Sequence, residues 1–169
     1  MVKHKQQRGF LVIEALVAIL IFSLGILGLV AMGSTAIGAQ SDARFRTDAA
    51  ALADEIANQM AVLAARDTNP IPFGQPDLVL QASLLTFARL PVGAAGPAGC
   101  PFTGAAGNPV VTAWAASVVN GPRRLPGATV TSQQIIVDTA AFNRVDITVC
   151  WQGPNDQATR RHTLVTYIN

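Results

Sequence analysis

Hydrophobic positions along this chain form one continuous apolar run near the N-terminus and shorter periodic segments after it. Residues 10–32 contain a single charge, Glu14. As an α-helix this run is about 35 Å long, and the hydrocarbon core of a bilayer is about 30 Å thick. The pattern therefore predicts a membrane-spanning helix over residues 10–32.

The charges that flank this run predict its orientation. Three basic residues precede it, namely Lys3, Lys5 and Arg8. No charge follows it until Asp42. Because basic flanks stay in the cytoplasm, we expect residues 1–9 inside and the chain beyond about residue 33 outside.

The helix is predicted to continue past the membrane, since no proline interrupts residues 10–69. A stripe with helical spacing follows the apolar run, made of Phe45, Ala49, Leu52, Ile56, Met60 and Leu63. We expect this amphipathic continuation, residues 33–66, to pack on a sheet. Arg44 and Asp48 form an i,i+4 pair on its polar side, and the prolines of residues 69–72 end it.

The remainder predicts a short helix, a loop and a sheet. Residues 77–90 suit a helix capped by Asp77, and the Gly- and Pro-rich residues 91–109 suit a loop. Four segments are strand candidates: residues 110–119, 128–137, 144–151 and 160–168. The last two alternate most clearly, and residues 153–156 form the turn of their hairpin. The expected fold class is α+β, with a long N-terminal helix packed on a C-terminal antiparallel sheet of about four strands.

Composition argues against several functions. Charged residues make up 13% of the 169 residues, half the usual share, so the chain is too apolar to be disordered. No nucleophile–histidine constellation or metal-ligand spacing is present, so we expect no enzyme, cofactor or metal. His162 is expected at the surface or at the edge of the sheet. Two arginine pairs, at 123–124 and 160–161, are a weak signal for DNA. Without the three basic residues that precede the apolar run, the net charge falls from +2 to −1, which weakens that signal further.

Cys100 and Cys150 are the two cysteines of the chain. In an exported domain an even pair predicts a disulfide, which would tie the loop at residues 91–109 to the penultimate strand. Two free buried thiols are the alternative.

The junction of leader and apolar run carries a family resemblance. Gly9-Phe10 follows the basic leader, and Glu14 is the fifth residue counted from Phe10. This arrangement resembles the class III signal of type IV pilins and pseudopilins. The stretch of residues 23–29, Ser-Leu-Gly-Ile-Leu-Gly-Leu, is most similar to the PilV family of minor pilins. Major pilins usually carry a proline near the position of Ala31, which this chain lacks.

The resemblance implies processing by a prepilin peptidase, which would cut between Gly9 and Phe10 and methylate the amino group of Phe10. Glu14 would then pair with the Phe10 ammonium of a neighbouring subunit. The implied organisation is a leader (1–9), a transmembrane or filament-core helix (10–32), its continuation (33–66), an αβ-loop region (67–109) and a sheet domain (110–169).

The resemblance further implies a minor pilin that acts in pilus assembly initiation or in the tip complex. Its partners would be the peptidase, the inner membrane, the other minor pilins and the major pilin, with nucleic acid not expected. The protein would sit in the inner membrane with a periplasmic domain and then enter the pilus. Three alternatives remain: a minor pseudopilin of type II secretion, a bitopic membrane-anchored periplasmic binding domain that never polymerises, and a DNA-binding pilin.

Overall fold

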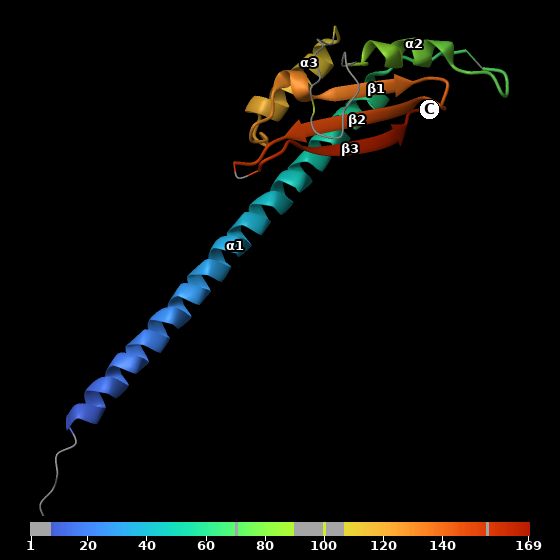
Figure 1. Ribbon diagram of the computed structural model, residues 1–169. Helices are drawn as coiled ribbons and strands as arrows, with labels where there is room; N and C mark the ends of the chain where they lie inside the picture. The colour runs from blue at the N-terminus through green and yellow to red at the C-terminus, as the bar shows by residue number, and fades with distance from the viewer. Residues whose placement is uncertain (1–7, 70, 90–99, 101–106, 155) are drawn as a thin grey trace, which may run out of the picture. The chain divides into compact units, whose positions relative to one another are not determined.

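The computed structural model describes residues 8–69, 71–89, 100, 107–154 and 156–169 (Figure 1). Its helices are α1 (Arg8–Leu63), α2 (Leu78–Thr86) and α3 (Pro109–Asn120), with a 3-10 turn η1 (Val130–Ser132). Its strands are β1 (Gln134–Asp138), β2 (Arg144–Trp151) and β3 (Arg160–Tyr167). The chain forms two compact units that divide within α1, after Ala43. Most of the expected leader and most of the expected loop at residues 91–109 lie outside the described residues.

The first unit is the N-terminal part of α1. Its backbone is helical from Arg8 onward, and every side chain from Val12 to Ser41 is exposed. The glycines at 25, 28, 33 and 38 do not interrupt the helix. This unit therefore has an apolar surface on all sides.

The second unit, residues 44–169, contains the hydrophobic core. The C-terminal part of α1 contributes the predicted stripe: Ala49, Leu52, Ile56 and Met60 are fully buried or nearly so. Phe45 packs against the core while partly exposed, whereas Leu63, the last residue of α1, is 54% exposed. Core residues from all three strands pack with this stripe, so the predicted packing of helix on sheet is confirmed.

The sheet is antiparallel with strand order β1-β2-β3. The central strand β2 has the bounds predicted for it, and β3 ends one residue earlier than expected. Successive hairpins pair Ile135 with Ile147 and Ile147 with Leu164 on the core side. The α+β class is confirmed, with three strands among the described residues rather than about four.

The missing strand is a helix, so the strand prediction for residues 110–119 was wrong. Asn108 accepts a hydrogen bond from the Val110 amide at 2.9 Å, and Pro109 occupies the first turn of α3. The buried residues of α3 have helical spacing, namely Val111, Trp114, Ala115 and Val118. The Trp114 indole donates to the backbone oxygen of Leu52 at 2.8 Å and so fixes α3 to α1.

Three other boundaries also differ from the prediction. The helix expected over residues 77–90 is α2, which ends at Thr86. Within residues 128–137 only β1 is a strand, because residues 129–132 close a 3-10 turn whose Ser132 hydroxyl bonds Thr129. α1 ends at Leu63, where the Arg66 guanidinium donates to the free backbone oxygens of Ala61 and Ala64. The predicted helix cap at Asp77 is confirmed, since its carboxylate accepts from the Leu80 amide at 2.9 Å.

Candidate functional site

The exposed apolar surface of α1 is the first candidate site. Within the described residues, α1 is long and apolar enough to cross a membrane, by length and composition, and its apolar window is not buried by the rest of the chain. Large apolar side chains on it are exposed, such as Phe22 (70% exposed) and Leu29 (71% exposed). A surface of this size needs lipid or other protein around it. It is compatible with a single-pass anchor.

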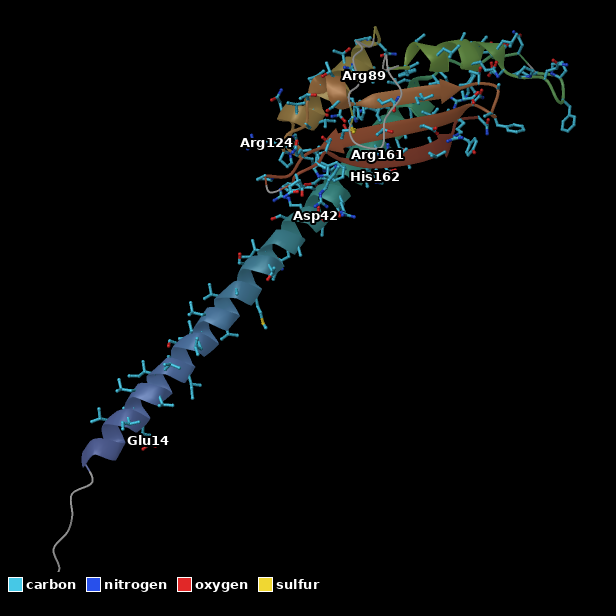
Figure 2. All side chains as sticks on the ribbon, in the orientation of Figure 1. Glu14, Asp42, Arg89, Arg124, Arg161 and His162 are labelled. Atoms are coloured by element: carbon cyan, nitrogen blue, oxygen red, sulfur yellow. A yellow bond between two sulfur atoms is a disulfide. The ribbon has the colours of Figure 1, made fainter. Side chains whose placement is uncertain are left out.

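Glu14 is the charged residue on this surface. It lies near the start of α1 and is exposed, as Figure 2 shows. The backbone of Gly9 and Phe10 belongs to the helical turn that precedes it, and the Phe10 side chain lies outside the described set. No described residue forms an ion pair with Glu14. A carboxylate in this position is costly in lipid and is a functional residue by default.

The hydroxyl groups of the apolar run differ from Glu14 in this respect. Ser23 donates back to the Ile19 oxygen at 2.8 Å, and Thr35 donates to the Ala31 oxygen at 2.9 Å. These hydroxyl groups are hydrogen-bonded within the helix and therefore need no hydrogen-bond partner from another molecule. Glu14 is therefore the group on this surface that requires one.

Four glycines of α1 also lie on this exposed surface. A Cβ placed at Gly25, Gly28, Gly33 or Gly38 would meet nothing within 4 Å. Packing among the described residues therefore does not explain these glycines. Small residues on an apolar helix allow the backbone of another helix to approach closely.

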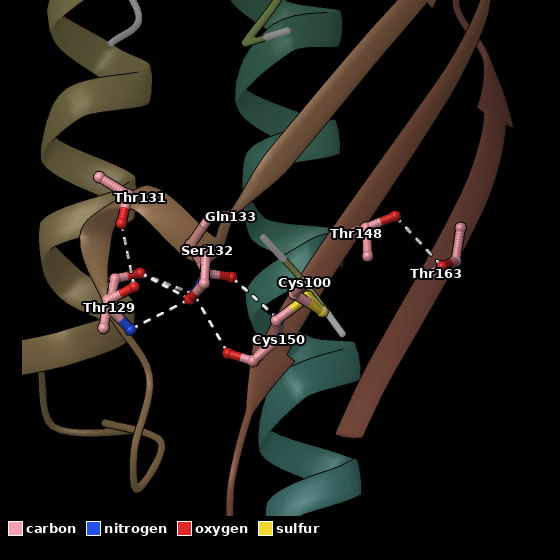
Figure 3. The surroundings of a disulfide bond; sticks show 8 residues. All are labelled: Cys100, Thr129, Thr131, Ser132, Gln133, Thr148, Cys150 and Thr163. Carbon is pink, nitrogen blue, oxygen red and sulfur yellow. Dashed lines mark hydrogen bonds between the residues drawn. A yellow bond between two sulfur atoms is a disulfide. The ribbon is translucent and has the colours of Figure 1, made fainter. Parts of the chain in front are cut away.

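The predicted disulfide joins Cys100 to Cys150 across fifty residues, with the two Cα atoms 6.2 Å apart (Figure 3). Cys150 is fully buried in β2. The bond ties the segment that contains Cys100 to the central strand of the sheet. The alternative of two free thiols is excluded in this structure.

The side-chain amide of Gln133 forms two hydrogen bonds with the backbone of Cys150 in β2. Gln133 Nε2 donates to the Cys150 oxygen at 3.1 Å, and the Cys150 amide donates to Gln133 Oε1 at 3.0 Å. Gln133 is 1% exposed and directly precedes β1. Its side chain therefore replaces a backbone pair at the end of the β1–β2 ladder.

A buried guanidinium supports Gln133 in turn. Arg89 Nε donates to the Gln133 oxygen at 3.1 Å, and Nη2 donates to the Val130 oxygen at 2.8 Å. Burial lowers the pKa of Arg89. Arg89 also exchanges two backbone hydrogen bonds with Ile135. Sequence reasoning missed both residues, because a glutamine before a strand and an arginine in an apolar segment carry no local signal for this arrangement.

Charged groups gather where β2 and β3 are connected. Arg160 donates two hydrogen bonds of 2.7 Å to Asp156, and these lower the pKa of that carboxyl group. His162 lies half-buried on the edge strand β3 beside Arg161, close to a cavity of about 360 Å³ (Figure 2). Part of the charge of the arginine pair at 160–161 is therefore balanced within the hairpin.

Among the described residues, no group of three His, Cys, Asp or Glu side chains is placed to hold a metal ion. The sequence of elements, a long N-terminal apolar helix followed by a small antiparallel sheet, is compatible with a pilin-like fold. Comparison with protein-family models, with curated proteins and with solved structures finds no match for this chain.

Proposed function

We propose that this protein is a minor pilin of the type IV pilus, similar to the PilV family, and that it acts in pilus assembly initiation or in the tip complex. One observation carries the proposal. Glu14 is an exposed carboxylate without a described ion-pair partner, on a helix whose surface is otherwise apolar, four residues after Phe10. The Gly9-Phe10 junction and the basic leader before it support the same reading.

The charge of Glu14 explains how subunits would recognise one another. Cleavage after Gly9 would create an ammonium group at Phe10, inside an apolar environment. Two unit charges 4 Å apart attract by about 4 kcal/mol at an effective dielectric constant of 20. That energy offsets the cost of holding a carboxylate in lipid, which is about 3 kcal/mol. Glu14 of one subunit would therefore be satisfied by Phe10 of an axially staggered neighbour.

The rest of the first unit suits the transfer from lipid to a helix bundle. The Ser23 and Thr35 hydroxyl groups are bonded within the helix, and its glycines leave room for close approach. An apolar helix loses no hydrophobic stabilisation when protein replaces lipid around it. The second unit, closed by its disulfide, would carry the contacts of this particular subunit.

The intact mass of the protein from cells with and without prepilin peptidase tests the processing step. We expect a mature form that begins at methylated Phe10 only when the peptidase is present. Full-length protein in both strains would contradict the proposal and favour a membrane-anchored binding domain.

The Glu14→Ala variant tests the assembly step. We expect it to be cut normally and to be absent from sheared pili, because its helix cannot neutralise the neighbour's ammonium. Glu55→Ala is the matched control, since Glu55 is an exposed carboxylate farther along the same helix. Normal incorporation of Glu14→Ala would remove the proposed role. A deletion strain that keeps its pili but no longer secretes exoproteins would instead indicate a pseudopilin of type II secretion.

A further inference from the structure

The second unit begins at Arg44, and a long stretch without charge precedes it in α1. Residues 15–41 contain no Asp, Glu, Lys or Arg. As a helix this stretch is about 40 Å long, which matches the thickness of a bilayer with both headgroup layers, about 40–45 Å. The first basic residues that follow it, Arg44 and Arg46, are therefore expected at the level of the headgroups opposite the leader.

Arginines surround this turn of α1 in the second unit. Arg44 and Arg46 point to opposite sides of the helix, because two residues span about 200° of its circumference. One cavity, of about 360 Å³, is lined by residues of α1, β2 and β3, namely Arg46, Trp151, Arg160, Arg161 and His162. Another, of about 580 Å³, is lined by Arg44 and by the loop after α3, which includes Arg124. We call these five arginines, at 44, 46, 124, 160 and 161, the arginine collar.

Carboxylates balance only part of the charge of the arginine collar. Asp48 lies 3.5 Å from Arg44, and both oxygens of Asp156 accept from Arg160 at 2.7 Å. Neither cavity has an Asp or Glu among its lining residues. Arg124 and Arg161 are exposed, and no described residue forms an ion pair with either of them (Figure 2). The arginine collar therefore keeps a net positive charge, even when the Asp42 carboxylate one turn before Arg46 is counted against it.

The charge of the second unit is also polarised along the sheet. β2 is about 25 Å long, and its last residue, Trp151, lines the cavity that contains Arg46. Carboxylates gather at the other end of β2. Asp138 is the last residue of β1 there, and Asp77 lies beside the β1–β2 loop and accepts from the Asp67 amide at 3.2 Å. An anionic surface would therefore attract the end of the unit that carries the arginine collar and repel the opposite end.

We propose that the arginine collar binds the phosphate groups of anionic phospholipids and so holds the second unit against the membrane surface. Guanidinium groups match phosphate oxygens in charge and in the geometry of their donors. A ring of arginines around one turn of a helix suits a flat anionic surface from which that helix emerges, whereas a nucleic acid strand is bound along a basic groove. Each arginine near such a surface strengthens the attachment by a factor of about five. The proposal rests on the membrane anchor and not on assembly into a pilus.

Tryptophan quenching in lipid nanodiscs tests this attachment. The full-length protein would be placed in discs of phosphatidylcholine alone or with about 30% phosphatidylglycerol, each with a trace of lipid that carries a nitroxide quencher on its headgroup. Trp151 lines the first cavity and so reports the approach of the arginine collar to the headgroups. We expect about twofold stronger quenching in the anionic discs, and we expect about 0.5 M salt to abolish this difference by screening.

A double variant, Arg124→Gln with Arg161→Gln, removes two charges of the arginine collar without breaking a described ion pair. We expect it to lose more than about half of the difference in quenching between the two discs, with an unchanged urea midpoint. The matched control is Arg66→Gln with Arg144→Gln, which removes two charges at the opposite end of β2. It should keep the full difference, and the urea midpoint of each variant shows that it is folded.

Inorganic phosphate separates a lipid surface from an isolated phosphate site. At constant ionic strength, millimolar phosphate should leave the quenching in anionic discs unchanged, because one small ion cannot occupy the whole collar. Reversal of the quenching by millimolar phosphate would assign the arginines to free phosphate and overturn the proposal. Binding of duplex DNA to phosphatidylcholine discs, lost in the double variant and combined with equal quenching in both discs, would assign them to nucleic acid.

Two further results would also overturn the proposal. One is equal quenching in the two kinds of disc. The other is an equal loss in the two double variants, which would show a response to net charge rather than to the arginine collar. Either failure would leave the peptidase and Glu14 experiments unaffected, because neither involves these arginines.

Discussion

Removal of the Cys100–Cys150 bond by a double alanine substitution should destabilise the second unit strongly. The bond closes a loop of fifty residues around the central strand. In the chain-entropy model this closure lowers the entropy of the unfolded chain by about 14 cal/mol/K, or about 4 kcal/mol at 25 °C. Cys150 is fully buried, and alanine at that position preserves most of its packing. The expected loss of about 4 kcal/mol is a large part of the stability of an ordinary domain.

Urea unfolding of the full-length protein in nanodiscs measures this loss. The two tryptophans, Trp114 and Trp151, are both buried in the second unit and report its unfolding by fluorescence. With a slope of about 2 kcal/mol per molar urea, the midpoint should fall by about 2 M. Wild-type protein with a reductant should have the same urea midpoint as the double variant, and the reductant should not change the midpoint of the variant. A shift below about 0.5 M, with the disulfide verified by mass, would refute the loop-closure reasoning.

Three further predictions concern the same unit. Gly127→Ala should lower the free energy of unfolding by more than about 1 kcal/mol, because φ is +61° and the new Cβ would lie 2.7 Å from a backbone oxygen. The urea midpoint of the variant measures this loss, and an unchanged midpoint would contradict it. Trp114→Phe should lower the free energy of unfolding by about 1–2 kcal/mol, because it removes the buried hydrogen bond to the Leu52 oxygen. Fluorescence of the remaining tryptophan, Trp151, follows the unfolding, and an unchanged stability would show that the bond contributes nothing net. Because Arg160 lowers the folded-state pKa of Asp156, the ionised carboxylate stabilises the fold above its unfolded pKa, and this contribution is lost as pH falls through the lower folded value. The melting-temperature advantage of wild type over Asp156→Asn should therefore shrink below about pH 4, and a constant difference down to pH 2 would be inconsistent with this linkage.

Elements whose pattern was set by local chemistry were predictable from the sequence. The buried stripe of α1 follows from helical spacing, and β2 follows from strict alternation bounded by a turn. The cap at Asp77 follows from the hydrogen-bonding capacity of a carboxylate before an apolar run. In each case one periodicity or one side chain determines the local structure.

The segment that became α3 shows where this reasoning failed. Its valines favour a strand, and the strand interpretation gave them too much weight. The signals for a helix were also in the sequence, since Asn108 and Pro109 form a helix start and the buried positions repeat with helical spacing. A tertiary contact adds to these local signals, because the Trp114 indole on α3 donates to the Leu52 oxygen of α1 at 2.8 Å.

The candidate sites differ in the same way. Glu14 and its neighbours are contiguous, so the sequence alone identifies them. By contrast, a cavity of about 680 Å³ in the second unit is lined by residues far apart in the sequence, among them Ile71, Leu80 and Phe142, which no local pattern connects. The two hydrogen bonds between the Gln133 side chain and the Cys150 backbone likewise depend on how β1 and β2 align. Such features appear only once the register of the strands is known.

The order of the elements along the chain also constrains when this protein can fold. The apolar stripe of α1, residues 49–60, is synthesised first, but the sheet that covers it comes from residues 134–167. During synthesis the stripe therefore remains uncovered by the sheet until nearly the whole chain has been made. Each strand then pairs with the next one made, so the sheet needs only short-range contacts and can assemble quickly. The interval in which the sheet leaves the stripe open to aggregation is thus limited by synthesis of the last hairpin rather than by the search for strand partners.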